Sequence, residues 1–140
     1  MDQEQWRKVW EMAENFFGGK VDALCNNAGI FHKTDWKKVL DINFMGVAYG
    51  TMLAIEKMGV SHGGTGGLIV QTGSMASFLA GFPTIEEGAY TAAKQGIHGY
   101  CRAMANEETY IKYTNSILEH LIWLYMKGKG SHGRSLSLVC

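Results

Sequence analysis

Apolar residues recur at intervals of three and four along the first part of the chain, with polar residues between them. Over residues 3–17 this spacing predicts an amphipathic helix. Its apolar face consists of Trp6, Val9, Trp10, Ala13, Phe16 and Phe17. Gly18 and Gly19 come next. Glycine is typical of the position just past a helix C-terminus, so we expect the helix to end there.

The same spacing returns over residues 34–58 and predicts a second helix. Thr34 is its expected N-cap, and Asp35 lies in the first turn, where the helix dipole favours an acid. The apolar face consists of Trp36, Val39, Leu40, Val47, Ala54, Ile55 and Met58. Asn43 lies on that face, where an amide must find hydrogen-bond partners or lower the stability.

Two apolar runs are of strand length, at residues 21–25 and 68–70, and a glycine-rich loop at 61–67 precedes the second. Unbroken apolar strands that alternate with helices are typical of a parallel sheet covered by helices. Such sheets bind ligands at the carboxyl ends of their strands. The sequence Asn-Asn-Ala-Gly at 26–29 and Ser74 both follow strands, so they indicate a site at that edge.

Beyond the second strand the pattern is less regular. Residues 75–88 predict an irregular segment, and a helix is expected from about residue 89 to near 106. Residues 107–127 also have helical spacing, and residues 135–140 are expected to begin a final strand. The length of the chain predicts one domain over residues 1–140.

Composition narrows the classes of function. The 140 residues hold 13 Lys and Arg against 13 Asp and Glu, and this balance argues against a broad nucleic-acid or anionic-membrane surface. The chain does not begin like a signal peptide, and its most apolar stretch, residues 117–126, is too short to span a bilayer. The 3 cysteines are widely spaced and the histidines have no metal-ligand spacing. We therefore expect no disulfide framework, no metal, and a reducing, cytoplasmic location.

Tyr90 and Lys94 form the pair with the clearest chemistry. Their spacing puts both side chains on one face of a helix, one turn apart. An ammonium near a phenol favours the phenolate, so such a tyrosine can act as a general acid or base near neutral pH. The same spacing occurs on helices by chance. Taken alone, Ser74 suits a turn or cap, and Asn43 suits a buried structural amide.

Four features nevertheless occur together, in one order. They are Asn26-Asn27-Ala28-Gly29, Asp41-Ile42-Asn43, Ser74 after its strand, and Tyr90-Thr91-Ala92-Ala93-Lys94. As a set, over about residues 3–105, they resemble the short-chain dehydrogenase/reductase family. The second feature and the glycine-rich loop are most similar to the NAD-dependent 15-hydroxyprostaglandin dehydrogenase branch. The resemblance implies an oxidoreductase with a partial Rossmann-like, doubly wound parallel sheet and helices on both faces.

The resemblance implies catalytic roles for Asn43, Ser74, Tyr90 and Lys94. Tyr90 would exchange a proton with the substrate oxygen, and Ser74 would hold that oxygen. Lys94 would favour the phenolate of Tyr90 and hydrogen-bond the nicotinamide ribose. Asn43 would support a water in the proton relay that leads to Lys94.

The resemblance also implies a nicotinamide cofactor, NAD or NADP, with NAD favoured. Asn27, Ala28 and Gly29 would line the cofactor, and glycine there would allow a close approach of the backbone. Tyr90 and Lys94 would contact the cofactor as well.

Substrate contacts are expected from Ser74 and Glu87. Ser74 lies 16 residues before Tyr90, where the family usually has about thirteen, and Ser77 stands at the family spacing as a rival. We prefer Ser74 because its distances from the strand and from Asn43 fit the family, which requires an insertion in the following loop. Glu87 belongs to that loop, and the alternative for it is a solvated pair with its neighbouring glutamate.

Two further departures from the family concern the ends of the chain. The family's opening strand, glycine-rich turn and helix hold the cofactor pyrophosphate on backbone N–H groups. No counterpart precedes residue 26, so we expect the N-terminal phosphate-binding unit to be missing. Residues 107–133 match nothing in the family and are expected to be an insertion, and residues 136–140 resemble the start of the family's next strand. A truncated or alternatively spliced product, or a faulty gene model, would account for these departures.

The predicted function is hydride transfer between nicotinamide and a secondary alcohol or ketone, such as a hydroxy-prostaglandin-like or other lipid alcohol, impaired by truncation. The alternative is a non-catalytic fragment that pairs with or modulates a full-length dehydrogenase. Besides a small-molecule substrate, we expect a homo-oligomer or a hetero-oligomer with a full-length relative. We expect no nucleic acid and no membrane span.

Overall fold

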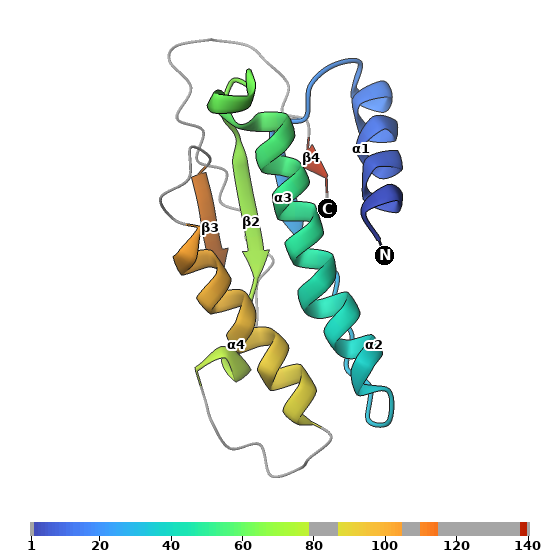
Figure 1. Ribbon diagram of the computed structural model, residues 1–140, viewed down its shortest axis with the longest axis vertical. Helices are drawn as coiled ribbons and strands as arrows, with labels where there is room; N and C mark the ends of the chain where they lie inside the picture. Colours follow the sequence, from blue (N-terminus) through green and yellow to red (C-terminus); the bar gives the residue numbers. More distant parts are fainter. Residues whose placement is uncertain (1, 79–86, 105–109, 115–137, 140) are drawn as a thin grey trace.

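The computed structural model describes residues 2–78, 87–104, 110–114 and 138–139 (Figure 1). Its helices and strands are α1 (Gln3–Phe17), β1 (Ala23–Asn26), α2 (Trp36–Leu40), α3 (Gly46–Met58), β2 (Leu68–Thr72), α4 (Gly88–Ala103), β3 (Tyr110–Thr114) and β4 (Leu138–Val139). A π-helical turn, Asp41–Met45, joins α2 to α3, and short 3-10 turns occupy Val60–His62 and Met75–Ser77.

The four strands form one parallel sheet in the order β3-β2-β1-β4. Figure 1 shows α3 and α4 crossing the same face of this sheet, with α1 beside α3. On the central strands, side chains alternate between that face and the opposite one, and both sets are buried. Strands buried on both faces are typical of parallel α/β sheets, so the predicted fold class is confirmed.

Helix α1 begins and ends as its sequence predicts. The Asp2 carboxylate accepts from the Gln5 backbone N–H, while the Gln5 side chain accepts from the Asp2 N–H, a reciprocal capping box. At the other end Gly18 takes φ 67°, and backbone bonds close the last turn onto Asn15 and Glu14. A side chain at this φ would be strained, which is why glycine stops the helix here.

The second helical segment differs from its prediction at its start. Its N-cap is Asp35, whose carboxylate accepts from the Lys38 N–H at 3.0 Å, and not Thr34. The Nδ1 of His32 accepts from the N–H groups of Thr34 and Asp35, and this bonding holds the chain one residue longer before it turns helical. Trp36, predicted on the apolar face, is 62% exposed, because it stands on the first turn of the helix and projects beyond the core.

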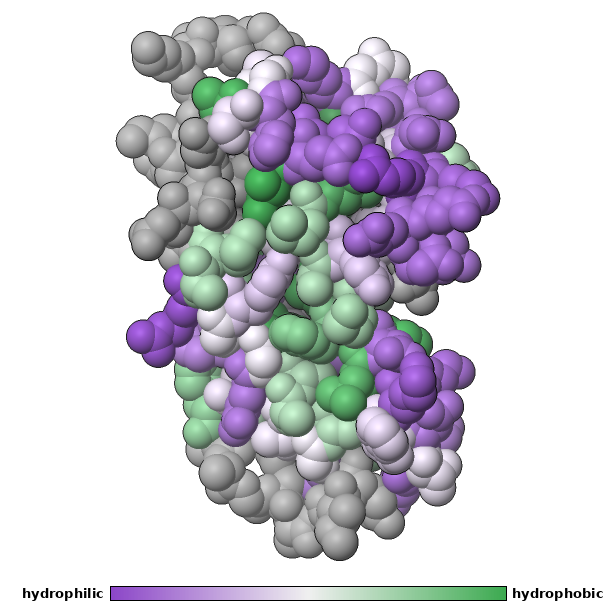
Figure 2. Space-filling model, viewed as in Figure 1, coloured by the Kyte–Doolittle hydropathy of each residue, from purple (hydrophilic) through white to green (hydrophobic). Residues whose placement is uncertain are grey.

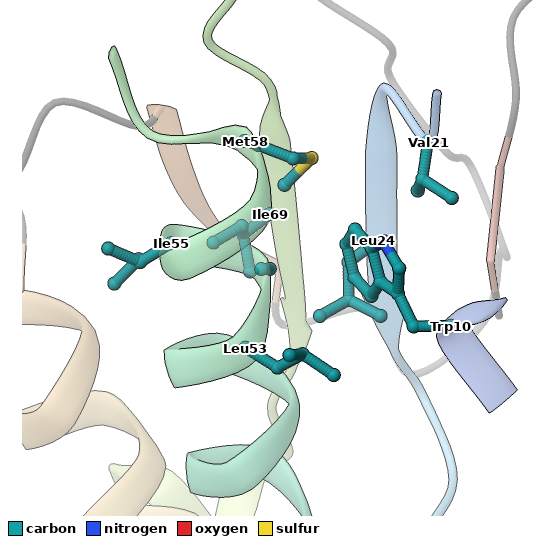
Figure 3. Close-up of a cluster of buried hydrophobic side chains, with 8 residues drawn as sticks. Trp10, Val21, Leu24, Leu53, Ile55, Met58 and Ile69 are labelled. Carbon is teal, nitrogen blue, oxygen red and sulfur yellow. The ribbon is translucent and has the colours of Figure 1, made fainter. Parts of the chain in front are cut away.

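The main core lies between α1, α3 and the sheet. It consists of Trp10, Val21, Leu24, Leu53, Ala54, Ile55, Met58 and Ile69. Figure 3 shows Trp10 of α1 against Leu24 of β1, with Leu53 and Met58 of α3 pointing toward the same space. Burying aliphatic and aromatic groups of this size stabilises a fold by about 1.5–3 kcal/mol each, so this cluster is what holds α1 and α3 on the sheet.

The C-terminal predictions are partly wrong. Residues 110–114, expected within a helix over 107–127, form strand β3, which pairs with β2 along its whole length. Backbone pairing with an existing strand outweighs the helical spacing of the local sequence. The final strand does form, but it lies on the other side of β1, so it is not the strand expected to follow α4. The rest of residues 107–137 lies outside the described part of the chain.

The segment Trp36–Met58 is long and apolar enough, by composition alone, to cross a membrane, with mean hydropathy 1.2 over its best window. Half of that window is buried inside the fold. A helix packed on a central sheet meets the same test. Figure 2 shows apolar and small side chains along the middle of the face where α3 and α4 lie, and polar side chains gathered over α1.

Gly50 provides a test of the packing between α1 and α3. A Cβ added there would lie 2.7 Å from both Asn26 Oδ1 and Trp6 Cζ2. We expect Gly50→Ala to lower the free energy of unfolding by about 1–3 kcal/mol, as overpacking does. The measurement is chemical denaturation followed by circular dichroism.

The matched control is Gly99→Ala in α4, where an added Cβ would meet nothing within 4 Å. That variant should gain up to about 1 kcal/mol from the higher helix propensity of alanine. Equal effects of the two substitutions would contradict the close approach at Gly50.

Candidate functional site

The candidate site lies where β1 and β2 end, bordered by the π-turn and by the first half of α4. A cavity of about 400 Å³ opens beside the end of β1. Its lining residues are Gln5, Trp6, Val9, Cys25, Asn26, Asn27, Ala28, Ile42, Gly46 and Val47. Most of the lining residues are apolar, and Gln5, Asn26 and Asn27 supply polar side chains, which is the usual character of a small-molecule pocket.

Asn43 is fully buried, and both ends of its amide are paired with one residue. Its Nδ2 donates to the Ile30 carbonyl and its Oδ1 accepts from the Ile30 N–H, each at 2.7 Å. The π-turn places it there: the Gly46 N–H bonds to the Asp41 carbonyl, five residues back, and widens the helix at this point. Such turns are frequent at functional sites. Asn43 therefore fixes the path of the chain just after the Asn-Asn-Ala-Gly sequence.

Gly29 brings that chain close to Lys94. A Cβ on Gly29 would lie 3.4 Å from Asn43 Oδ1 and 3.8 Å from Lys94 Nζ. Gly29, Asn27 and Ala28 are exposed, so the predicted cofactor-lining backbone is accessible. The structure thus brings together three elements that are separate in sequence: the end of β1, the π-turn and α4.

Lys94 is 5% exposed, although its side chain carries an ammonium. Its Nζ donates to the Thr72 carbonyl at 2.9 Å and lies 5.8 Å from the centroid of the Tyr90 ring. Burial lowers the pKa of Lys94 below its ordinary value, because the charged form loses solvation there. The helix therefore holds the amine at the end of β2, beside the phenol.

Tyr90 and Glu87 stand on the first turn of α4, where Glu87 is the N-cap residue. Both are half-buried. The Tyr90 ring packs edge-on against Phe31, with 5.7 Å between centroids. Phe31 belongs to the loop that Asn43 fixes, so this contact orients the phenol against that loop.

Ser74 and Ser77 are separated by their surroundings. Ser74 is half-buried, caps the 3-10 turn and accepts from the Ala76 N–H through its Oγ at 3.2 Å. Ser77 is buried, and its hydroxyl donates to the Lys94 carbonyl at 3.0 Å. The hydroxyl proton of Ser77 is committed to α4, whereas Ser74 is the more accessible of the two.

Four hydrogen bonds near the site were not foreseen from the sequence. Thr72 holds Lys94 through its carbonyl, and its Oγ1 donates to the Asn27 side chain at 3.1 Å. Beneath it, Thr51 Oγ1 accepts from Asn26 Nδ2 at 3.1 Å and from Gln71 Nε2 at 2.6 Å. The only sign of these bonds in the sequence was the polar residue at the end of each of the two strands.

The parallel sheet puts this protein in the doubly wound α/β class. A Tyr–Lys pair and two serines gather at the carboxyl ends of its strands, where such sheets bind their ligands. The family model described as short chain dehydrogenase matches residues 1–116. The chain therefore belongs to the short-chain dehydrogenase family, whose members are oxidoreductases that use NAD or NADP. The match includes residues 107–116, which were expected to lie in an insertion.

Curated relatives are consistent with this. The chain is 36% identical over 104 residues to 15-hydroxyprostaglandin dehydrogenase [NAD(+)] of Homo sapiens, and 35% identical over 104 residues to an NADP-dependent (R)-specific alcohol dehydrogenase of Lentilactobacillus kefiri. These alignments cover 74% and 69% of this chain but 38% and 39% of the relatives. The chain thus spans less than half the length of the proteins it matches.

Solved structures show the same likeness. The apo form of LigO from Sphingobium sp. strain SYK-6 superposes with a TM-score of 0.65 at 30% identity, over 76% of this chain and 40% of that one. A short chain dehydrogenase/reductase from Burkholderia phymatum in complex with NAD gives 0.67 at 27% identity, over 80% and 43%.

Removing the Asn43 amide should loosen the loop after β1. In Asn43→Ala the Ile30 N–H and carbonyl lose their partners, at about 1–3 kcal/mol for each buried group left unpaired. Hydrogen exchange should show a faster Ile30 amide, and thermal denaturation a lower midpoint. Asn15→Ala, at an exposed position of α1, is the control. An Ile30 amide that exchanges as in the wild type would contradict this role.

Lys94 should make stability depend on pH. Its folded-state pKa is lowered, so the buried ammonium disfavours folding at neutral pH, and this effect fades as pH rises through the folded-state pKa. We expect Lys94→Met to be at least as stable as the wild type at pH 7, with the stability difference shifting toward the wild type as the pH rises to about 10. Lys57→Met, at an exposed position, should show no such trend in pH-dependent thermal denaturation.

Proposed function

We propose that this site transfers hydride between a nicotinamide cofactor and a secondary alcohol or ketone. The observation that carries the proposal is the placement of Lys94. Its buried ammonium lies at the end of β2, 5.8 Å from the centroid of the Tyr90 ring. The Nζ donates to the carbonyl of Thr72, which is two residues before Ser74. A buried amine with one protein partner is poorly explained by stability alone.

Each side chain has a part in the proton transfer. Tyr90 exchanges the proton of the substrate oxygen, and the Lys94 ammonium lies 5.8 Å from the centroid of its ring. Ser74 donates to the same oxygen and stabilises its charge. Asn43, whose side chain is occupied by Ile30, supports the relay water through the main chain of the π-turn. The nicotinamide supplies the hydride chemistry when bound.

The residues present fit part of such a cofactor. The exposed backbone of Asn27, Ala28 and Gly29 runs from the cavity of about 400 Å³, which Asn27 and Ala28 line, toward Lys94, whose Nζ lies 3.8 Å from where a Cβ on Gly29 would stand. We favour NAD over NADP, because the 15-hydroxyprostaglandin relatives are NAD(+) enzymes and one solved neighbour holds NAD. The NADP-dependent alcohol dehydrogenase supports the other choice.

For substrate we propose a hydroxy-prostaglandin-like or other lipid alcohol, by similarity to those relatives. We expect Glu87, the N-cap of α4 and one turn before Tyr90, to contact such a substrate. One domain over residues 1–140 and a cytoplasmic location complete the proposal.

A second candidate is a non-catalytic subunit that pairs with a second copy or with a full-length relative. Met45 and Met52 are 37% and 55% exposed, on the π-turn and on α3. Exposed methionines of this kind suit a protein contact.

The test is a fluorescence titration of the full chain with NADH and NADPH. We expect saturable NADH binding that Lys94→Ala weakens about tenfold, the effect of losing one charged hydrogen bond. Lys57→Ala, an exposed lysine at the end of α3, is the matched control and should bind as the wild type does.

A chain that is folded by circular dichroism but binds neither cofactor would rule out an independent enzyme. Mixing that chain with an intact 15-hydroxyprostaglandin dehydrogenase, and measuring the mass of the complex, would then test the second candidate. A chain that stays monomeric in the mixture would rule that out too.

A further inference from the structure

We propose that Ser77 is a positioning residue whose hydroxyl fixes the position of Lys94 relative to Ser74. Its effect on catalysis rests on the proposed function, whereas its effect on Lys94 does not. Ser77 was a rival for the serine that meets the substrate, and its contacts assign it a different task.

The Ser77 hydroxyl bridges two segments of the site. Its Oγ–H donates to the Lys94 carbonyl at 3.0 Å, and its Oγ accepts from the Ser74 N–H at 3.3 Å. These directions are fixed, because a carbonyl only accepts and an amide N–H only donates. The Ser77 N–H in turn donates to the Ser74 carbonyl at 2.9 Å. At 7% exposure the hydroxyl is shielded from competing water.

Lys94 is consequently held at both ends. Ser77 holds its main chain, and the Thr72 carbonyl holds its Nζ at 2.9 Å. Thr72 lies two residues before Ser74, so the bonds form a closed ring through Thr72, Ser74, Ser77 and Lys94. Without the Ser77 hydroxyl, the Lys94 main chain would lose its bond to the 3-10 turn, and Lys94 would shift relative to Ser74 while the turn stays on α4.

The ring also explains why Ser74 can serve the substrate. The Ser74 Oγ accepts from the Ala76 N–H, and within the described part of the chain its own proton has no acceptor. It can therefore donate to a substrate oxygen. The Ser77 proton is already used, so the two serines divide the work between holding substrate and holding the helix.

The segment should stay docked when Ser77 is changed. The Phe78 ring packs edge-on against His98 of α4, with 4.8 Å between centroids, and Ala76 is buried beside them. This contact anchors the 3-10 turn independently of the hydroxyl. Ser77→Ala is therefore expected to fold.

The first experiment follows the titration of Lys94 by NMR in the ligand-free chain. In Ser77→Ala the pKa of Lys94 should move toward its ordinary value, because the amine is no longer held in its buried place. Ser77→Thr, which keeps the hydroxyl, should restore the wild-type titration. If the added methyl group of threonine prevents folding, Ser77→Cys is used in place of Ser77→Thr. Leu53→Ala, in the core between α1 and α3, controls for general destabilisation. A Ser77→Ala chain that titrates like the wild type at Lys94 would overturn the proposal.

The second experiment uses kinetics with NAD and a secondary alcohol. Ser77→Ala should lower kcat about ten- to a hundredfold, as small misplacements of reacting groups do, and Ser77→Thr should recover it. Leu53→Ala should lose stability and keep kcat. A wild-type chain that does not bind NADH would end the proposed function, and the Lys94 titration would still decide the role of Ser77. An unchanged kcat in Ser77→Ala would overturn its catalytic consequence.

Discussion

The parallel register between β1 and β2 is the constraint on which the site depends. Asn26 pairs with Gln71 at the last rung, so the two strands end at the same level. Both amides then point to Thr51 of α3, and the next residues, Asn27 and Thr72, reach each other. A slip of one residue would turn every side chain of one strand to the other face. The helix and the serine segment would then have no common place to attach.

At the ends of these strands the site buries polar groups in positions where packing favours apolar ones. Asn43 and Lys94 are both buried. The Asn43 amide is paired through its oxygen and its nitrogen, and within the described residues the Lys94 ammonium donates to one carbonyl. The Asn43 contacts make a loop rigid. Burial lowers the pKa of Lys94 because the ammonium loses solvation, and the buried charge therefore opposes folding at neutral pH. The Asn43 amide therefore stabilises the loop, whereas the burial of Lys94 costs stability.

Local patterns were enough to predict the bounds of α1, the two central strands and α4 to within about three residues. The spacing of apolar residues and the glycines that end helices act over short distances in the sequence. Tyr90 and Lys94 were found for the same reason, since one turn of helix fixes their relation. The strand β3 was missed, because its state comes from pairing with β2 and not from its neighbours in sequence. Thr72 and Ser77 were likewise beyond prediction, since their roles depend on carbonyls brought near by the tertiary fold.

The crossovers of this sheet have a consequence for how the molecule reaches its native state. Ala23 pairs with Leu68, 45 residues later, and Leu68 pairs with Tyr110, 42 residues later. Contacts so distant in sequence close large loops and form slowly. Until they form, α1 and α4 can be helical while the strand edges remain open to other chains. The site therefore forms at the last stage of folding. A newly made chain needs protection from aggregation until then.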